Sequence, residues 1–488
     1  MTIPGFLPRL LRRPGLIALC SLALMPAAVA QLSATQKAAI GFTGLQDRLG
    51  ASMPLGIGVS ASIVEAPDNG NYRLNTADAQ LQGKTFQFPS GGSTGVSAHA
   101  TTVGRYLFGT QSLAPRVGAT VDGSTVANYE VNNWINAGFL NANNTALLPA
   151  VEPRRLVNHS WVGTFGDATT DTVILNRADF ATQRDGTIAT YALNNGSGTT
   201  IPALMASTYN GIVVGLSNGN HSRGTTTVNG PGRQKPDLVV PTEFTSWATP
   251  TVSSAAGLLT QVAATTSGLG NGQRQQVVKS LVMAGATKAG IDLPGTWSWS
   301  NSPTEPLDPV YGAGQLDVEA AYDILVAGEF EAGSSFAAAT GWDFGTASAA
   351  TPRRYFFDVD PSLAGGSLTA SLNWQRTMTA TDTDPRPAFT NYVFGGTLAN
   401  LDLRLYSASG FTLGSLVSQS MSTVENTELI WSTGLSPGRY ALEVSSDAAA
   451  VDYGVAWVTV VPEPGTWAII SVAAVAWAAV ARRRRRAG

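Results

Sequence analysis

The feature that most constrains the fold is an alternation of short apolar runs with helical segments between residues 56 and 327. The runs Ile57–Val64 and Gly211–Leu216 are apolar, rich in β-branched residues and bounded by turn residues, which is typical of buried strands. Thr245–Ala264 and Gln273–Ala284 have the pattern of helices. Because alternating strands and helices form a parallel sheet covered by helices, we expect an α/β fold with a doubly wound parallel sheet.

The pattern changes after about residue 330, where short alternating strands separated by turns predict an all-β sandwich. This architecture and the run Leu401–Tyr406 resemble jelly-roll modules. The predicted strands are Tyr355–Val359, Leu368–Trp374, Leu401–Leu405, Leu429–Trp431, Tyr440–Val444 and Tyr453–Trp457. We therefore divide this part of the chain into an N-terminal extension (31–56, with one helix at Ala38–Leu49), an α/β domain (57–329), an Ala/Gly/Ser-rich linker (330–351) and a β-sandwich (352–460).

Residues 1–30 have the pattern of a secretory signal peptide. Three arginines precede an apolar run, Leu16–Leu24, and Ala28-Val29-Ala30 suits cleavage by signal peptidase. The single cysteine, Cys20, lies inside this segment, so the mature chain is predicted to contain no disulfide. We expect an exported protein.

Residues 461–488 resemble the PEP-CTERM sorting signal. Pro462-Glu463-Pro464 precedes an apolar stretch, Trp467–Ala481, and five arginines, Arg482–Arg486. The resemblance implies transient insertion of this tail in the membrane, cleavage by an exosortase, and a mature protein in the cell envelope, on the outer surface or outside the cell. A permanent tail anchor is the alternative, although the stretch is shorter than the roughly 20 residues of a spanning helix.

Charge composition limits the possible partners. Eight of the 30 basic residues lie in these two terminal segments, so the rest of the chain is acidic overall. An acidic surface argues against nucleic acid as a partner. The sequence indicates no cofactor, and it leaves calcium binding and the oligomeric state open.

The segment around Ser246 has the features of a nucleophile site. Ser246 lies at the start of a predicted helix, where free backbone N–H groups and the helix dipole favour an oxyanion. An ordinary N-cap serine is the alternative. The sequence Lys-Pro-Asp at 235–237, followed by Thr-Ser-Trp-Ala-Thr-Pro at 245–250, resembles the catalytic block of subtilisin-like serine peptidases, Lys-Pro-Asp and then Gly-Thr-Ser-Met-Ala-Thr-Pro.

A serine hydroxyl needs a base to take its proton, and the chain has three histidines, His99, His159 and His221. The segment Ser97–Gly104 resembles the His-Gly-Thr-His-Val-Ala-Gly block of the same family, which implies that His99 is the catalytic histidine. The strand at 58–65 resembles the one that ends in the orienting aspartate of the family, and Glu65 stands at that position. Asp68 is the alternative acid.

Two further segments resemble the substrate-binding parts of these peptidases. Thr190–Gly196 is similar to a block whose asparagine donates to the oxyanion, which implies that role for Asn194, with Asn195 as the alternative. Val157–Gly163 is similar to the strand that lines the substrate cleft, which implies cleft positions for Ser160 and Trp161.

The resemblance implies a secreted serine endopeptidase that hydrolyses polypeptides through an acyl-enzyme. Three departures favour the alternative of a catalytically degenerate surface or matrix binding protein: Glu65, a short loop after Pro241, and Phe244 at the position of a small residue. An esterase of the α/β-hydrolase kind is disfavoured because Ser246 lacks the Gly-x-Ser-x-Gly motif.

Overall fold

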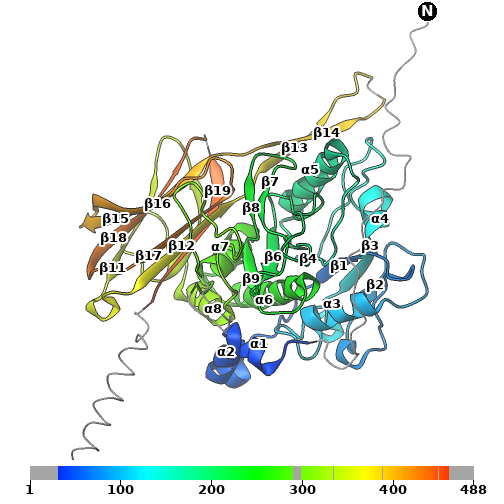
Figure 1. Ribbon diagram of the computed structural model, residues 1–488, viewed down its shortest axis with the longest axis horizontal. Helices are drawn as coiled ribbons and strands as arrows, with labels where there is room; N and C mark the ends of the chain where they lie inside the picture. The colour runs from blue at the N-terminus through cyan, green and yellow to red at the C-terminus, as the bar shows by residue number, and fades with distance from the viewer. Residues whose placement is uncertain (1–30, 289–297, 334, 387, 449, 461–488) are drawn as a thin grey trace, which may run out of the picture.

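The computed structural model describes residues 31–288, 298–333, 335–386, 388–448 and 450–460 (Figure 1). The predicted signal peptide and the predicted sorting signal lie outside the described residues. Within those residues, a search for helices with the length and hydropathy of a membrane span finds none.

A parallel sheet of seven strands forms the centre of the α/β unit, with the order β2-β3-β1-β4-β5-β6-β9. Every neighbouring pair is parallel, which confirms the predicted doubly wound α/β fold. The chain builds β2 and β3 on one side of β1 and the later strands on the other, and ligands bind at the carboxyl ends of strands beside such a reversal. The strands are β1 (Ala61–Glu65), β2 (Phe86–Gln87), β3 (Val126–Glu130), β4 (Leu156–His159), β5 (Ile188–Ala192), β6 (Ile212–Leu216) and β9 (Leu238–Val240).

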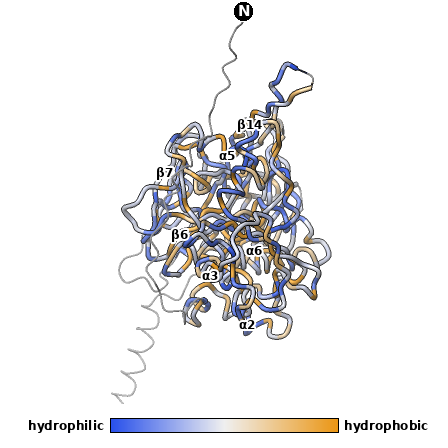
Figure 2. Tube along the Cα trace, turned by 90° about the vertical axis from the view of Figure 1, so that its right-hand side faces the viewer, coloured by the Kyte–Doolittle hydropathy of each residue, from blue (hydrophilic) through white to orange (hydrophobic). Residues whose placement is uncertain are grey.

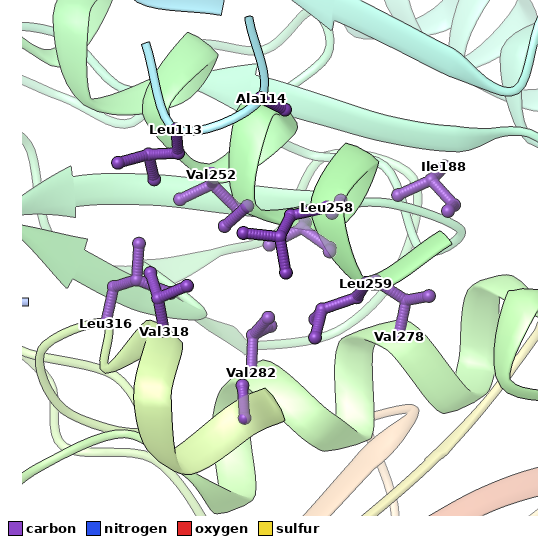
Figure 3. Packing of buried hydrophobic residues seen from close by; sticks show 14 of the residues in the cluster. Leu113, Ala114, Ile188, Val252, Leu258, Leu259, Val278, Val282, Leu316 and Val318 are labelled. Carbon is purple, nitrogen blue, oxygen red and sulfur yellow. The ribbon is translucent and has the colours of Figure 1, made fainter. Parts of the chain in front are cut away.

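Helix α6 (Thr245–Thr265) packs at the centre of this unit. Its small residues allow close approach, and almost its whole length is buried. Figure 3 shows Leu258 and Leu259 of α6 directed toward Val278 and Val282 of α7 (Gln275–Ala284). The other long helices are α3 (Ala98–Phe108), α5 (Ala168–Asp185) and α8 (Val318–Ala327).

The N-terminal extension contains two helices where the sequence predicts one. Helix α1 spans Ala34–Ala39 and α2 spans Phe42–Leu49. Gly41 separates them with a positive φ of 71°, a conformation that glycine adopts at little cost. A Cβ at this position would collide with the Asp317 side chain, so tertiary packing as well as the turn requires glycine here.

The C-terminal part is a sandwich of two four-stranded antiparallel sheets, β10-β19-β12-β17 and β11-β18-β15-β16. All six predicted strands are present. Strand β10 lies inside the stretch predicted to be a linker, so the linker prediction is wrong for that part of 330–351. The strands are β10 (Gly341–Ala347), β11 (Arg353–Val359), β12 (Ser367–Trp374), β15 (Leu401–Ser409), β16 (Thr412–Ser420), β17 (Thr427–Thr433), β18 (Gly438–Ser446) and β19 (Val451–Val460).

The sandwich packs directly on the α/β unit. Ser280 of α7 donates a hydrogen bond to the carbonyl oxygen of Gly454 in β19 (2.8 Å). Trp342 of β10 is fully buried in the hydrophobic cluster that contains α6 and α7, and its indole N–H donates to the carbonyl oxygen of Leu325 (2.9 Å). One hydrophobic cluster therefore spans the two regions as a shared core, and the sandwich has a second cluster of its own.

A hairpin of β13 (Thr377–Asp382) and β14 (Tyr392–Thr397) extends from the sandwich along α5. Its end protrudes from the body of the molecule in both views (Figures 1 and 2). Phe394 packs edge-on against Phe180 of α5, with ring centroids 5.2 Å apart. The hairpin thus adds a second attachment between the two regions.

Candidate active site

Glu65 and His99 form a close pair at the carboxyl edge of the parallel sheet. Glu65 is the last residue of β1 and is fully buried. Its Oε2 lies 2.7 Å from Nδ1 of His99, the second residue of α3. The side chain of Ser97 caps this helix by accepting from the backbone N–H of Ala100 (3.0 Å), which fixes the start of α3 beside the end of β1.

The environment of Glu65 directs its charge toward the imidazole. Burial raises the pKa of Glu65 above its usual range, and the neighbouring His99 acts in the opposite direction. Its other oxygen, Oε1, is buried and has no hydrogen-bond partner within the described residues. The stabilisation available to a Glu65 carboxylate at this position therefore comes chiefly from His99.

Asp68 makes no comparable contact with the histidine. Its Oδ1 accepts a hydrogen bond from the side-chain amide of Asn69 (3.0 Å), and its backbone pairs with Asn71 in a turn. Of the two acids proposed from the sequence, Glu65 is the one in contact with His99.

The other two histidines have structural surroundings. Burial lowers the pKa of His159 to about 3 and that of His221 to about 4. The Trp161 indole N–H donates to Nδ1 of His159 (3.2 Å), and the backbone N–H of Leu216 donates to Nδ1 of His221 (3.0 Å). Both rings are therefore neutral at physiological pH, with their Nδ1 atoms already engaged.

Ser246 is the second residue of α6 and points its hydroxyl at the same edge of the sheet. Its Oγ donates to the carbonyl oxygen of Ser160, just beyond β4, at 3.3 Å. In the described part of the chain no hydrogen bond joins Ser246 to His99. Phe244 precedes the helix and supplies no side-chain cap, and the backbone N–H of Ser246 has no intrahelical acceptor in the first turn.

The residues proposed for substrate binding follow β4 and β5, at the edge of the sheet where Ser246 lies. Ser160 supplies the carbonyl that Ser246 contacts, and Trp161 is buried next to it. Asn194 follows β5, and its side-chain amide donates to the carbonyl oxygen of Thr200 (3.3 Å). The Asn195 side chain instead accepts from the backbone N–H of Thr245 (2.9 Å), which holds the residue before Ser246.

Two contacts were missed by reasoning from the sequence. The hydrogen bond from Ser246 to Ser160 depends on where β4 ends relative to α6, and no local pattern encodes that. The aromatic ring of Trp247 lies beside the His99 imidazole; the only signal was an aromatic residue immediately after the predicted nucleophile. As for metals, the described residues contain no group of three or more His, Cys, Asp or Glu side chains able to hold an ion.

Comparisons with known proteins give structural matches but no sequence matches. No family model and no curated protein matches the chain. Similar solved structures include the MycP3 protease from the type VII (ESX-3) secretion system, at 12% identity and TM-score 0.39 over 64% of this chain and 94% of that one. Fervidolysin from Fervidobacterium pennivorans, a keratinolytic enzyme related to subtilisin, matches at 11% identity and TM-score 0.36 over 86% of this chain and 76% of its own. Sphericase matches at 17% identity and TM-score 0.35 over 55% of this chain and 98% of its own.

Proposed function

We propose that the protein is an exported serine endopeptidase with Ser246 as nucleophile, His99 as general base and Glu65 as the acid that orients His99. The observation that supports this most strongly is the 2.7 Å contact between a fully buried Glu65 and Nδ1 of His99. A buried carboxylate at Nδ1 fixes the tautomer in which Nε2 can accept a proton, and it stabilises the imidazolium that forms. Within the described residues, neither His159 nor His221 forms a hydrogen bond or ion pair with a carboxylate.

In the proposed reaction, Ser246 Oγ attacks the carbonyl carbon of a peptide bond as its proton moves to Nε2 of His99. The tetrahedral intermediate carries a negative oxygen, which the backbone N–H of Ser246 and the amide of Asn194 would stabilise. The C–N bond then breaks, the leaving amine takes the proton from His99, and the acyl group stays on Ser246. Water, deprotonated by His99, hydrolyses this ester and restores the serine.

Two side chains must move for this chemistry. Ser246 Oγ has to leave the Ser160 carbonyl, which a change of its χ1 rotamer allows, and the Asn194 amide has to leave Thr200. Catalytic hydrogen bonds are often long or misaligned before substrate binds, so the resting geometry is compatible with the proposal.

The hydrogen bond from Ser246 to Ser160 also favours a second candidate function, that of a catalytically degenerate surface or matrix binding protein. While the Ser246 hydroxyl donates its hydrogen bond to the Ser160 carbonyl oxygen, no base can take its proton. In that case the cleft would bind polypeptide without cleaving it, and Ser246→Ala would leave peptide binding unchanged.

Hydrolysis of a peptide library by the purified protein distinguishes the two functions. We expect Ser246→Ala and His99→Ala each to lower kcat/KM by a factor on the order of 10³–10⁶, because the triad acts as a unit. Glu65→Asp should also lower the rate, since shortening the side chain withdraws the carboxylate from His99. A wild-type protein that binds peptides but releases no products would contradict the peptidase function.

We also propose that the terminal segments direct export and sorting, with signal peptidase removing residues 1–30 and an exosortase cleaving near Pro462-Glu463-Pro464. The basis is the order of basic, apolar and small-residue segments at one end and of Pro-Glu-Pro, apolar stretch and arginines at the other. The intact mass of protein from the native host tests this proposal. A mature form that retains Arg482–Arg486 would replace processing with a permanent tail anchor.

A further inference from the structure

The indole of Trp247 makes a second contact with the His99 imidazole. The two ring centroids are 5.3 Å apart and the planes are inclined by 33°. The same indole stacks on Tyr106, with centroids 5.6 Å apart and planes within 3° of parallel. His99 and Tyr106 lie about two turns apart on one face of α3, so one side chain from α6 contacts this helix at both points.

The contact between Glu65 and His99 does not by itself fix the rotation of the imidazole ring about its Cβ–Cγ bond. A hydrogen bond at Nδ1 holds one ring atom, but the torsion between the Cβ and Cγ atoms of histidine is broad, so the ring can tilt. A flat indole packed against the ring selects one tilt. Trp247 is 7% exposed and Glu65 is fully buried, so both partners of His99 are largely shielded from water, while the His99 side chain itself is 11% exposed.

Trp247 also connects the histidine to the nucleophile. It follows Ser246 in the first turn of α6, so a shift of that turn moves the hydroxyl and the indole together. We propose that Trp247 is a positioning residue whose indole sets the tilt of the His99 imidazole and aligns Nε2 with Ser246. The role assigned to this alignment rests on the proposed peptidase function.

Phe244 supports the indole from the other side. The two rings meet edge to face, with centroids 6.2 Å apart and planes at 88°. Phe244 and Trp247 are the positions at which this segment differs from the block Gly-Thr-Ser-Met-Ala-Thr-Pro. Because the two departures contact each other, they act as a matched pair: the phenyl ring fills the space beside the indole, and the indole reaches the histidine.

The test compares Trp247→Leu, which removes the flat surface, with Trp247→Phe, which keeps an aromatic face. The first readout is the rate at which a fluorophosphonate labels Ser246. We expect the leucine variant to label about 10- to 100-fold more slowly and the phenylalanine variant to recover most of the rate, because small misplacements of reacting groups are costly. With a peptide substrate, the loss should appear in kcat rather than in KM.

The second readout is the NMR spectrum of the His99 ring protons, which the nearby indole shifts by its ring current. This shift should disappear in Trp247→Leu while the His159 and His221 signals stay in place. Phe86→Leu is the matched control, because Phe86 packs on Phe108 near the other end of α3 (6.2 Å), away from His99. If Trp247→Leu does not fold, Tyr106→Leu, which removes the stacking partner of the indole, serves as the test variant.

The outcomes separate the two hypotheses. Normal labelling and unchanged His99 ring signals in Trp247→Leu would overturn the positioning role and leave the peptidase function intact. Absence of labelling in folded wild-type protein would overturn the peptidase function. The ring signals would then still decide whether Trp247 orders His99, because they are read from the imidazole itself.

Discussion

The α/β unit and the β-sandwich bury their acidic groups in different ways. In the α/β unit, the buried Glu65 contacts His99, and the buried Asp237 lies between Lys235 and Lys279. In the sandwich, the buried Asp343 accepts a hydrogen bond from the Tyr355 hydroxyl (2.6 Å). Lys235 and Lys279 lower the pKa of Asp237 although burial acts in the opposite direction, whereas burial raises the pKa of Asp343.

A positively charged neighbour favours the ionised form of a buried acid more strongly than a neutral hydroxyl donor does. Asp237 therefore favours the ionised form, and Asp343 keeps its proton to a higher pH than a free aspartate does.

The largest expected effect comes from the shared core. Trp342→Ala should lower the free energy of unfolding by about 3–5 kcal/mol, because it leaves a cavity between β10, α7 and α8. Trp374→Ala is the matched variant, since Trp374 is equally buried but lies in the sandwich's own cluster. Hydrogen exchange should show lost protection in both regions for Trp342→Ala and mainly in the sandwich for Trp374→Ala. Identical patterns for the two variants would mean that Trp342 does not couple the regions.

The second largest loss of stability is expected from Asp237 in the α/β unit. Asp237 is fully buried, with Oδ1 3.0 Å from Lys235 Nζ and Oδ2 3.3 Å from Lys279 Nζ. Asp237→Asn should lower the free energy of unfolding by about 3–5 kcal/mol, because it removes the carboxylate that pairs directly with two buried lysines. Chemical denaturation measures this loss. A loss below about 1 kcal/mol would show that the pairing of Asp237 with Lys235 and Lys279 contributes little to stability.

The free energy of unfolding should depend on pH because of Asp343 in the sandwich. Burial raises the pKa of Asp343 from 3.8 to about 6. The folded state therefore holds a proton that the unfolded state releases, so this stabilisation is complete below about pH 4 and is lost as the pH rises through 6. The loss should reach about 2–3 kcal/mol.

Thermal unfolding at pH 4 to 8, compared between wild type and Asp343→Asn, isolates this contribution. The difference between the two proteins should change across pH 4–6 and level off above it. A constant difference over the whole range would show that Asp343 does not titrate in this window.

The smallest expected effect is at the surface of the sandwich. Asp358 pairs with Arg439 (2.8 Å) but is 57% exposed. Asp358→Asn should change the free energy of unfolding by less than about 1 kcal/mol, because water screens such pairs. Chemical denaturation under the conditions used for Asp237→Asn provides the direct comparison. Equal losses for the two variants would remove the contrast between the regions.

Much of the fold could be predicted from local patterns. Helix α6 is a long run of small and apolar residues, and several of the six sandwich strands alternate in polarity, so both signals depend only on neighbouring residues. Strand β10 was not predicted, because Gly and Ala dilute its alternation. The break at Gly41 was missed since it depends partly on the Asp317 side chain, far along the chain.

The candidate site was predictable to a similar extent. The contact between Glu65 and His99 follows from a strand end and a helix start whose motifs the sequence displays. The partner of Ser246 was not predictable, because the Ser160 carbonyl belongs to the backbone and no side-chain pattern marks it. The contact of Trp247 with His99 depends on how α3 and α6 cross, which the tertiary structure alone determines.

The central claim is that Ser246 is activated by the pair of His99 and Glu65, and labelling by a fluorophosphonate probe tests it most directly. Activated serines react with this probe, whereas N-cap serines do not. We predict a single modified peptide containing Ser246 in the wild-type protein, no modification in His99→Ala, and strongly slowed modification in Glu65→Gln. Folded wild-type protein that remains unmodified, or that reacts equally well without His99, would contradict the claim.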